Sequence, residues 1–295
     1  MKEALFYQKI DSQIVKCGLC HQFCHIAPSQ RGLCGVRENQ AGKLIALDYG
    51  LIIAANVDPI EKKPLYHFLP KTETFSIATV GCNLKCAHCQ NADISQASKE
   101  GKFFERSLLP GQPMLPEEVV EQALKFACPS ISYTYTEPTI FFEFALDCMK
   151  LASQAGLKNI WVSNGYTSLP ALEMAKPYLH AVNIDLKFFD NETYIKICGA
   201  TLQPILDNLI WYKKNNIWLE VTTLIIPTLN DNKKQLEGVA QFIKKELGED
   251  TPWHVSAFYP TYKLTDISPT SKETVLLAQK IGHQAGLKFV YTGNI

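Results

Sequence analysis

An alternation of strand-like and helix-like segments, from about residue 74 to the end of the 295-residue chain, constrains the fold most strongly. Runs rich in β-branched and aromatic residues predict strands at residues 75–80, 131–135, 159–163, 181–187, 217–225, 253–258 and 288–292. Apolar residues at helical spacing predict helices that begin at Pro116 and near Pro138, Leu169, Leu202, Asn232 and Ser271. Because such alternation gives parallel strands covered by helices, we expect an α/β fold built as a complete or partial (β/α) barrel, with a doubly wound open sheet as the alternative.

The first 70 residues do not follow this alternation. They contain four closely spaced cysteines and the segment KLIALDYGLIIAANV, residues 43–57, which predicts a β-hairpin. We therefore expect two domains: a cysteine-rich, metal-binding appendage with a hairpin at residues 1–70, and a barrel domain at residues 71–295.

Composition and charge narrow the function classes. Basic and acidic residues both number 29, so the overall charge neither implies nor excludes a nucleic-acid partner. No apolar run reaches the ~20 residues of a membrane span, and the N-terminus lacks the apolar core of a signal peptide, so we expect a cytoplasmic protein without a membrane partner. In that reducing compartment, ten cysteines indicate metal binding or catalysis rather than disulfides.

Three cysteines, Cys82, Cys86 and Cys89, directly follow the first predicted barrel strand in the stretch CNLKCAHC. A structural zinc site takes four protein ligands, so zinc would need His88 or a distant residue to complete it. An iron–sulfur cluster held by three thiolates leaves one iron open to a small molecule. We favour the cluster, because the loop follows a strand end, where the active sites of barrels lie.

Polar residues at two further strand ends are candidate ligands. Glu137 follows the strand at 131–135, and Ser163, Asn164 and Gly165 follow the strand at 159–163. The side chains of Ser163 and Asn164 could bind a carboxylate or a ribose, and Glu137 should lie at the rim of a barrel. For Glu137 the alternative is a solvated acid at the start of a helix.

The segment AVNIDLK places Asn183, Asp185 and Lys187 on one face of a predicted strand. Strands of parallel barrels are normally apolar on both faces, so these polar groups must pair or bind something. A ligand would explain Asp185 and Lys187, and an internal ion pair between them is the alternative.

The N-terminal cysteines Cys17, Cys20, Cys24 and Cys34 lie within 18 residues. Four thiols can form a closed structural zinc site, or they can hold an auxiliary 4Fe-4S cluster, and the spacing leaves both open. The other three cysteines stand alone in apolar sequence and predict small buried core residues: Cys128, Cys148 and Cys198.

The Cys-x3-Cys-x2-Cys motif after a first strand resembles the radical S-adenosylmethionine (SAM) superfamily, and His88 occupies the place of the planar residue before the third cysteine. The resemblance implies a partial (β/α)6-type barrel. It also implies that Cys82, Cys86 and Cys89 bind a 4Fe-4S cluster whose open iron binds SAM. One-electron reduction, by a ferredoxin-like or flavodoxin-like partner, then yields a 5′-deoxyadenosyl radical that abstracts hydrogen from a substrate.

The barrel region also resembles the activating enzymes of glycyl-radical proteins, such as the pyruvate formate-lyase activating enzymes. Glu137 and Pro138 match the end of a Gly-Gly-Glu-Pro motif that contacts the amine of SAM, although the two glycines are absent. The Ser163–Gly165 turn and the Asp185–Lys187 run have counterparts near the methionine and ribose. These enzymes are expected to carry an arginine in the fifth strand. It is absent here, which argues against the same mode of substrate binding.

A narrower resemblance covers nearly the whole chain. The blocks that carry it are CGLCHQFCHIAPSQRGLCGVREN, VDPIEKKPLYHFLP, CNLKCAHCQN, YTYTEPTIF, VSNGY, NIDLKFF, VTTLIIPTLND, PWHVSAF and FVYTGN. They resemble the radical SAM enzyme of the AmmeMemoRadiSam system, which implies Memo-type and AMMECR-type partners and an unknown substrate. The alternatives are a glycyl-radical activating enzyme, an RNA-modifying radical SAM enzyme and a metal-stabilised binding module without enzymatic activity.

Overall fold

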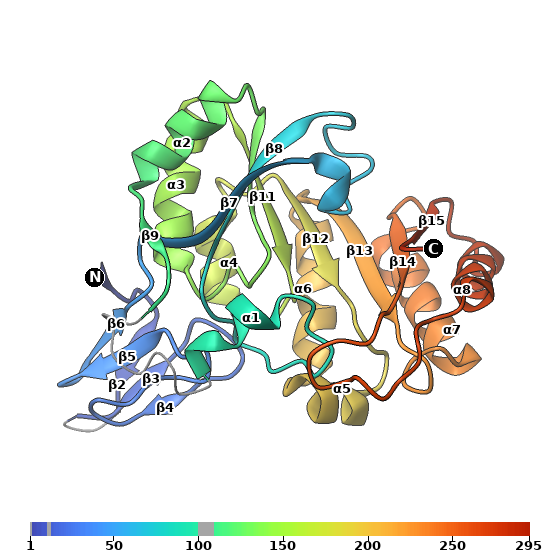
Figure 1. Ribbon diagram of the computed structural model, residues 1–295, viewed down its shortest axis with the longest axis horizontal. Helices are drawn as coiled ribbons and strands as arrows, with labels where there is room; N and C mark the ends of the chain where they lie inside the picture. The colour runs from blue at the N-terminus through green and yellow to red at the C-terminus, as the bar shows by residue number, and fades with distance from the viewer. Residues whose placement is uncertain (1, 11–12, 100–108) are drawn as a thin grey trace. The chain divides into compact units, whose positions relative to one another are not determined.

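The computed structural model describes residues 2–10, 13–99 and 109–295 (Figure 1). The chain divides into two compact units. The first unit comprises Met1–Leu84 and Asn91–Ala181, and the second comprises Lys85–Gln90 and Val182–Ile295. The division predicted at residue 70 stays a prediction, and each unit is described by itself.

The main sheet of the first unit contains three parallel strands, β8 (Glu73–Thr79), β10 (Ser130–Tyr133) and β11 (Lys158–Ser163). Strand β7 (Leu51–Pro59) pairs antiparallel with β8, and β9 (Gln112–Pro113) pairs with β7. The strand order is β11-β10-β8-β7-β9. Because β8, β10 and β11 run in the same direction, the residues that follow them meet at one edge of the sheet.

Helices α2 (Pro116–Lys125) and α3 (Phe142–Gln154) pack against each other in the first unit (Figure 1). Helix α2 begins at Pro116 as predicted, but the prediction that the next helix begins near Pro138 is wrong, because α3 begins at Phe142. The side chain of Glu137 accepts the backbone N–H of Thr139 at 3.0 Å, and this bond holds the residues before α3 in turns.

The remaining helices of the first unit are short. They are η1 (Ile60–Lys62), α1 (Ala92–Ser95), η2 (Ala97–Lys99) and α4 (Leu169–Ala175). Helix α4 begins at Leu169, where the sequence predicts a helix.

Two small antiparallel sheets form the N-terminal segment. One contains β2 (Tyr7–Lys9), β3 (Val15–Cys17) and β4 (His25–Ile26). The other contains β1 (Lys2–Glu3), β6 (Lys43–Ala46) and β5 (Arg37–Gln40).

The hairpin predicted at residues 43–57 is wrong. Strand β6 pairs with β5 and β1, whereas β7 pairs with β8 and β9 in the main sheet. The connection between β6 and β7 is fixed by Asp48, which is fully buried and accepts a hydrogen bond from the Thr79 hydroxyl at 2.8 Å. This bond directs the chain along β8 instead of back along β6.

A buried ion pair ties the N-terminal segment to α3. Arg37 and Glu143 are each about 1% exposed, and the Arg37 guanidinium donates from Nη1 to Glu143 at 3.1 Å. Arg37 also donates from Nη2 to Glu143 and, at 3.2 Å, to the backbone carbonyl of Ile140. The backbone N–H of Leu5 donates to the same carboxylate at 2.9 Å. Several of the hydrogen-bonding groups of this buried pair are thus satisfied within the first unit.

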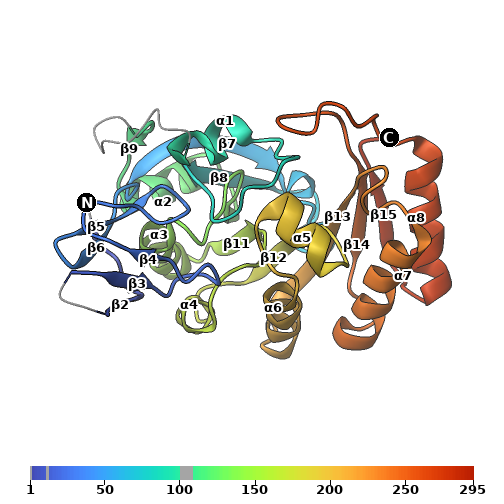
Figure 2. The ribbon, with the colours of Figure 1, turned by 90° about the horizontal axis from the view of Figure 1, so that it is seen from below.

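The second unit repeats the strand–helix pattern. Its strands are β12 (Ala181–Asp185), β13 (Trp218–Ile225), β14 (Trp253–Ala257) and β15 (Val290–Gly293), in the order β15-β14-β13-β12. Its helices are α5 (Asn191–Cys198), α6 (Gln203–Lys214), α7 (Lys233–Phe242), the short π-helix η4 (Ile243–Leu247) and α8 (Lys272–Ala285). Figure 2 shows α7 and α8 side by side, and α8 packs against β14 and β15.

The predicted starts of α7 and α8 are confirmed, because Asn232 and Ser271 cap them by accepting backbone N–H groups of the first turn. Parallel strands followed by helices occur in both units, and the strand order of the described residues does not close into a ring. The expected α/β fold with a partial barrel is therefore confirmed.

No helix in residues 2–10, 13–99 and 109–295 is long and apolar enough to cross a membrane.

We expect the loss of one partner of the Arg37–Glu143 pair to destabilise the fold strongly. Arg37→Met alone should lower the free energy of unfolding by about 3 kcal/mol or more, because it leaves a buried carboxylate without its partner. The double variant Arg37→Met/Glu143→Leu should recover part of that loss. Urea unfolding measures both.

The matched control is Lys233→Met, which breaks an ion pair whose lysine side chain is 78% exposed. It should cost less than about 1 kcal/mol. Equal losses for Lys233→Met and Arg37→Met would contradict the assignment of the buried pair.

Candidate functional site

The loop after β8 carries the three cysteines of the predicted cluster motif. Cys82 belongs to the first unit, and Cys86 and Cys89 belong to the second. Cys82 and Cys86 are buried, Cys89 is half-buried, and none of the three forms a disulfide. The backbone N–H of Leu84 donates to the Cys82 sulfur at 3.4 Å, which favours the thiolate form that binds metals.

In the first unit, Glu137 joins the ends of β10 and β11. Its carboxylate is fully buried and accepts hydrogen bonds from the Ser163 hydroxyl at 2.8 Å and from the Asn164 backbone N–H at 2.8 Å. Thr139 donates to it from both its backbone N–H and its hydroxyl. Burial raises the pKa of Glu137, and these hydrogen bonds oppose the rise. A solvated acid, the alternative considered for this residue, does not match this burial.

Asn164 connects this network to the cysteine loop. Its side-chain amide donates to the Asn83 side-chain oxygen at 2.7 Å and lies 3.7 Å from the Cys82 sulfur. Its own oxygen accepts the backbone N–H of Tyr166 at 3.0 Å, which fixes the turn after β11. The structure therefore brings the predicted residues Glu137, Ser163 and Asn164 together with Cys82.

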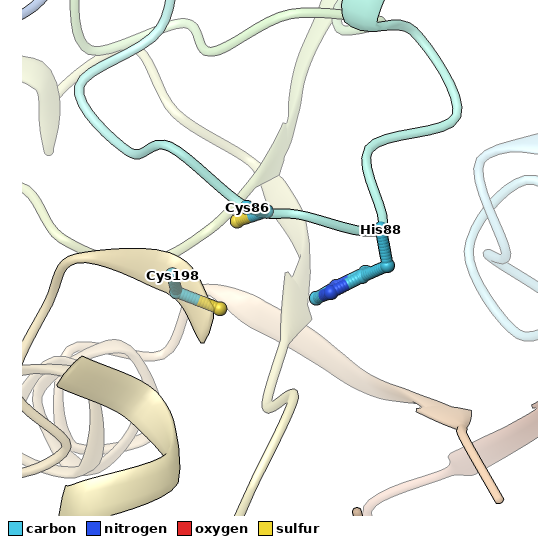
Figure 3. Close-up of side chains that lie close together, drawn as sticks. All are labelled: Cys86, His88 and Cys198. Atoms are coloured by element: carbon cyan, nitrogen blue, oxygen red, sulfur yellow. The ribbon is translucent and has the colours of Figure 1, made fainter. Parts of the chain in front are cut away.

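In the second unit, Cys86 and His88 lie beside Cys198, with their ligand atoms within 4.8 Å of one another (Figure 3). The backbone N–H groups of Lys85 and Ala87 donate to the carbonyls of Cys198 and Ile197, at 2.9 and 3.0 Å. These bonds fasten the loop to the C-terminal end of α5. Cys198 is buried, as the sequence predicts, but it does not stand alone, because its thiol lies beside two residues of the motif.

Asp185 and Lys187 form an ion pair of 2.6 Å, as one of the two interpretations of the segment expected. The Asp185 side chain keeps 36% of its surface exposed and the Lys187 side chain 15%, so the pair remains reachable by a ligand. Burial disfavours the charged lysine, but Asp185 and then the thiols of Cys86 and Cys198 outweigh it and hold the pKa of Lys187 well above its usual range.

The electrostatics around Cys86 favour a neutral histidine. Burial, and secondarily the charge of Lys187, lowers the pKa of His88 to about 3, so the imidazole is uncharged at neutral pH. Its ring packs edge-on against Phe188, with ring centroids 5.9 Å apart. A hydrogen bond with Cys198, and then burial, raises the pKa of the Cys86 thiol.

Asn183 and His254 belong to the framework of the second unit. The Asn183 side chain accepts the Thr222 hydroxyl at 2.9 Å. His254 is buried, pairs with Glu220 at 2.7 Å and stacks on Tyr291. These contacts are those of a core histidine.

The N-terminal cysteines lie in the first unit. Cys17, Cys20 and Cys34 are buried, Cys24 is half-buried, and all four are free thiols. Burial is the main cause that raises the pKa of each of them.

Comparison with known proteins identifies the family. Residues 76–243 match the radical SAM superfamily. An uncharacterized protein of Methanocaldococcus jannaschii is 45% identical over 295 residues, covering 100% of this chain and 86% of the relative. The pyruvate formate-lyase-activating enzyme of Clostridium pasteurianum is 25% identical over 65% of this chain and 83% of its own.

A radical SAM methyltransferase from Sphaerobacter thermophilus has a similar fold. The TM-score is 0.57 at 13% identity, over 76% of this chain and 67% of that one. The superfamily match covers more than half of the chain and includes all three cysteines of the motif, so this chain belongs to the radical SAM superfamily.

Proposed function

We propose that this radical SAM enzyme cleaves SAM reductively at a 4Fe-4S cluster held by Cys82, Cys86 and Cys89. The observation that carries the proposal is the contact of Asn164, and through it Glu137, with the Cys82 segment in the first unit. The donor set fits such a cluster, because the motif offers three cysteines that form no disulfide and contains no fourth cysteine. When bound, the cluster supplies one electron to the sulfonium, which releases methionine and a 5′-deoxyadenosyl radical.

The residues of the first unit hold the binding surface in place. Glu137 has its carboxylate oxygens engaged by Thr139, Ser163 and Asn164, so we assign it a positioning role rather than a catalytic one. Its hydrogen bonds fix the turn after β11, and Asn164 of that turn donates to the side chain of Asn83, the residue that follows Cys82. Such preorganisation removes the entropy cost of ordering these groups when SAM binds.

The residues of the second unit supply charge and apolar surface. The partly exposed carboxylate of Asp185 can accept hydrogen bonds from ribose hydroxyls, and Lys187 can balance the carboxylate of the methionine part. The neutral imidazole of His88, which packs edge-on against Phe188, lies beside Cys86.

Two substrate classes follow from the similarities. The blocks shared with the AmmeMemoRadiSam system support a substrate that is presented by Memo-type and AMMECR-type partner proteins. The 25% identity with the activating enzyme of Clostridium pasteurianum supports the second candidate, a glycyl-radical protein that loses a hydrogen atom from a backbone glycine. A ferredoxin-like or flavodoxin-like protein is the proposed electron donor in both cases.

The two candidates differ in the protein that stimulates SAM cleavage and in the radical that remains afterwards. Reconstituted enzyme, SAM and dithionite are mixed either with Memo-type and AMMECR-type proteins or with a glycyl-radical protein. Partner-dependent formation of 5′-deoxyadenosine in the first mixture supports the first candidate. A persistent glycyl-radical signal in electron paramagnetic resonance (EPR) in the second mixture supports the second.

Cys86→Ala should abolish formation of 5′-deoxyadenosine from SAM, because two thiolates do not hold the cluster that delivers the electron. Cys128→Ala, which removes a buried cysteine outside the motif, should leave the yield unchanged. Chromatography after dithionite reduction measures the product. Full activity in Cys86→Ala would disprove the proposed role of the three cysteines.

Glu137→Gln should weaken SAM binding and lower the free energy of unfolding by about 1–3 kcal/mol, because the new amide donor faces groups that themselves donate. Isothermal titration of the reconstituted protein and urea unfolding measure the two effects. The control is Glu73→Gln at the exposed start of β8, which should change neither. A Glu137→Gln protein that binds SAM like the wild type would rule out the positioning role.

Metal-free protein treated with diamide should form a disulfide between Cys86 and Cys198, because the two sulfurs lie within 4.8 Å. Each thiol loses a hydrogen as diamide is reduced. Mass spectrometry of the digested protein detects the linked peptides. Cys198→Ser should prevent the link and Cys148→Ser should not, and free alkylation of both Cys86 and Cys198 after diamide would contradict the observed proximity.

A further inference from the structure

The four N-terminal cysteines line one cavity of the first unit. Its wall includes Cys17, Cys20, Cys24 and Cys34. Strand β3 ends at Cys17, and Cys34 lies shortly before β5, so two elements fix the outer members of the set. Thiols from four positions therefore converge on a common space.

Backbone N–H groups are aligned with these sulfurs. The donor and acceptor pairs are Leu19 with Cys17, Gln22 with Cys20, Leu33 with Cys24 and Val36 with Cys34. The Leu33 nitrogen lies 3.5 Å from the Cys24 sulfur. Hydrogen bonds of this kind favour thiolates over thiols, and a thiolate is the form that binds metal.

The spacing of the sulfurs favours a group larger than one ion. In a tetrahedral zinc site, Zn–S bonds of about 2.3 Å place the sulfurs about 3.8 Å apart. Over the described ranges of the chain, the trio Cys86, His88 and Cys198 meets a 4.8 Å limit for three ligand atoms, and no three N-terminal sulfurs do.

The wall of the cavity carries buried donors that an iron–sulfur cluster can satisfy. Arg37 Nε and Asn83 Nδ2 are buried, line the cavity and have no hydrogen-bond partner among the described residues. Bridging sulfides accept N–H hydrogen bonds, and such bonds tune the potential of a cluster. A closed zinc site offers only thiolate sulfurs, each of which already has a backbone donor.

The cavity adjoins the peptide that carries Cys82. The Gln22 side chain donates to the Asn83 carbonyl at 3.0 Å, and a Cβ atom added to Gly81 would lie 2.9 Å from the Cys34 carbonyl oxygen. Cys20 forms a β-bridge with Thr167, just beyond the turn that holds Asn164. The segment that carries the N-terminal cysteines therefore contacts both segments that approach Cys82 in the first unit.

We propose that Cys17, Cys20, Cys24 and Cys34 hold a second 4Fe-4S cluster, which lies beside the peptide that carries Cys82. This cluster has four protein ligands and no open iron. It forms whether or not the protein cleaves SAM, so the proposal stands apart from the proposed function.

The test uses the full-length variant Cys82→Ala/Cys86→Ala/Cys89→Ala, reconstituted anaerobically with iron and sulfide. It should retain about four iron and four sulfide ions per chain, and dithionite should produce the EPR signal of a reduced 4Fe-4S cluster. One zinc ion and no iron in this variant, or no metal at all, would overturn the proposal.

A second variant assigns the retained iron. Adding Cys24→Ala to the triple variant removes the least buried thiol of the set and should change or abolish the EPR signal, while far-ultraviolet circular dichroism shows that the chain is folded. Adding Cys128→Ala instead should leave the signal unchanged. An unchanged signal with Cys24→Ala in a folded protein would also overturn the proposal.

The experiment separates this proposal from the proposed function. Wild-type protein that holds a cluster only at the N-terminal cysteines would support the second cluster and contradict SAM cleavage at Cys82, Cys86 and Cys89. A triple variant without iron, beside wild-type protein that cleaves SAM, would give the opposite result.

Discussion

The hydrogen bonds of the buried Glu137 carboxylate hold together the residues that follow β10 and β11. It draws the hydroxyl of Ser163 and the backbone of Asn164 toward the end of β10, so two strand ends share one acceptor. The Asn164 side chain then reaches Asn83 and Cys82. A carboxylate is suited to this position because it accepts several hydrogen bonds at once, which offsets the desolvation of its charge.

Much of the fold could be predicted from the sequence, because strands and helices are encoded locally. The β-branched runs located the strands, and Asn232 and Ser271 marked helix starts through their capping side chains. The hairpin predicted at residues 43–57 is wrong because a residue distant in sequence fixes the direction of the chain there. Asp48 turns the chain toward Thr79 of β8, and that contact, 31 residues away in sequence, has no signature in residues 43–57.

Some residues of the candidate site could be identified from the sequence, and others only from the structure. Cys82, Cys86 and Cys89 are recognisable because their spacing is short and fixed, and Glu137, Ser163 and Asn164 follow predicted strands. Cys198 gave no such signal, because it lies at the end of α5, far along the chain from the loop that it contacts. The four N-terminal cysteines have a short spacing that is visible in the sequence, whereas the cavity that they line is visible only in the structure.

The Arg37–Glu143 pair has a consequence for the order of events during synthesis. The two residues are separated by 106 positions in the sequence, so Arg37 leaves the ribosome long before Glu143 has been synthesised. The β-bridge between Cys20 and Thr167 likewise forms only after Thr167 has been synthesised. The N-terminal segment therefore reaches its final position only after more than half of the polypeptide has been made.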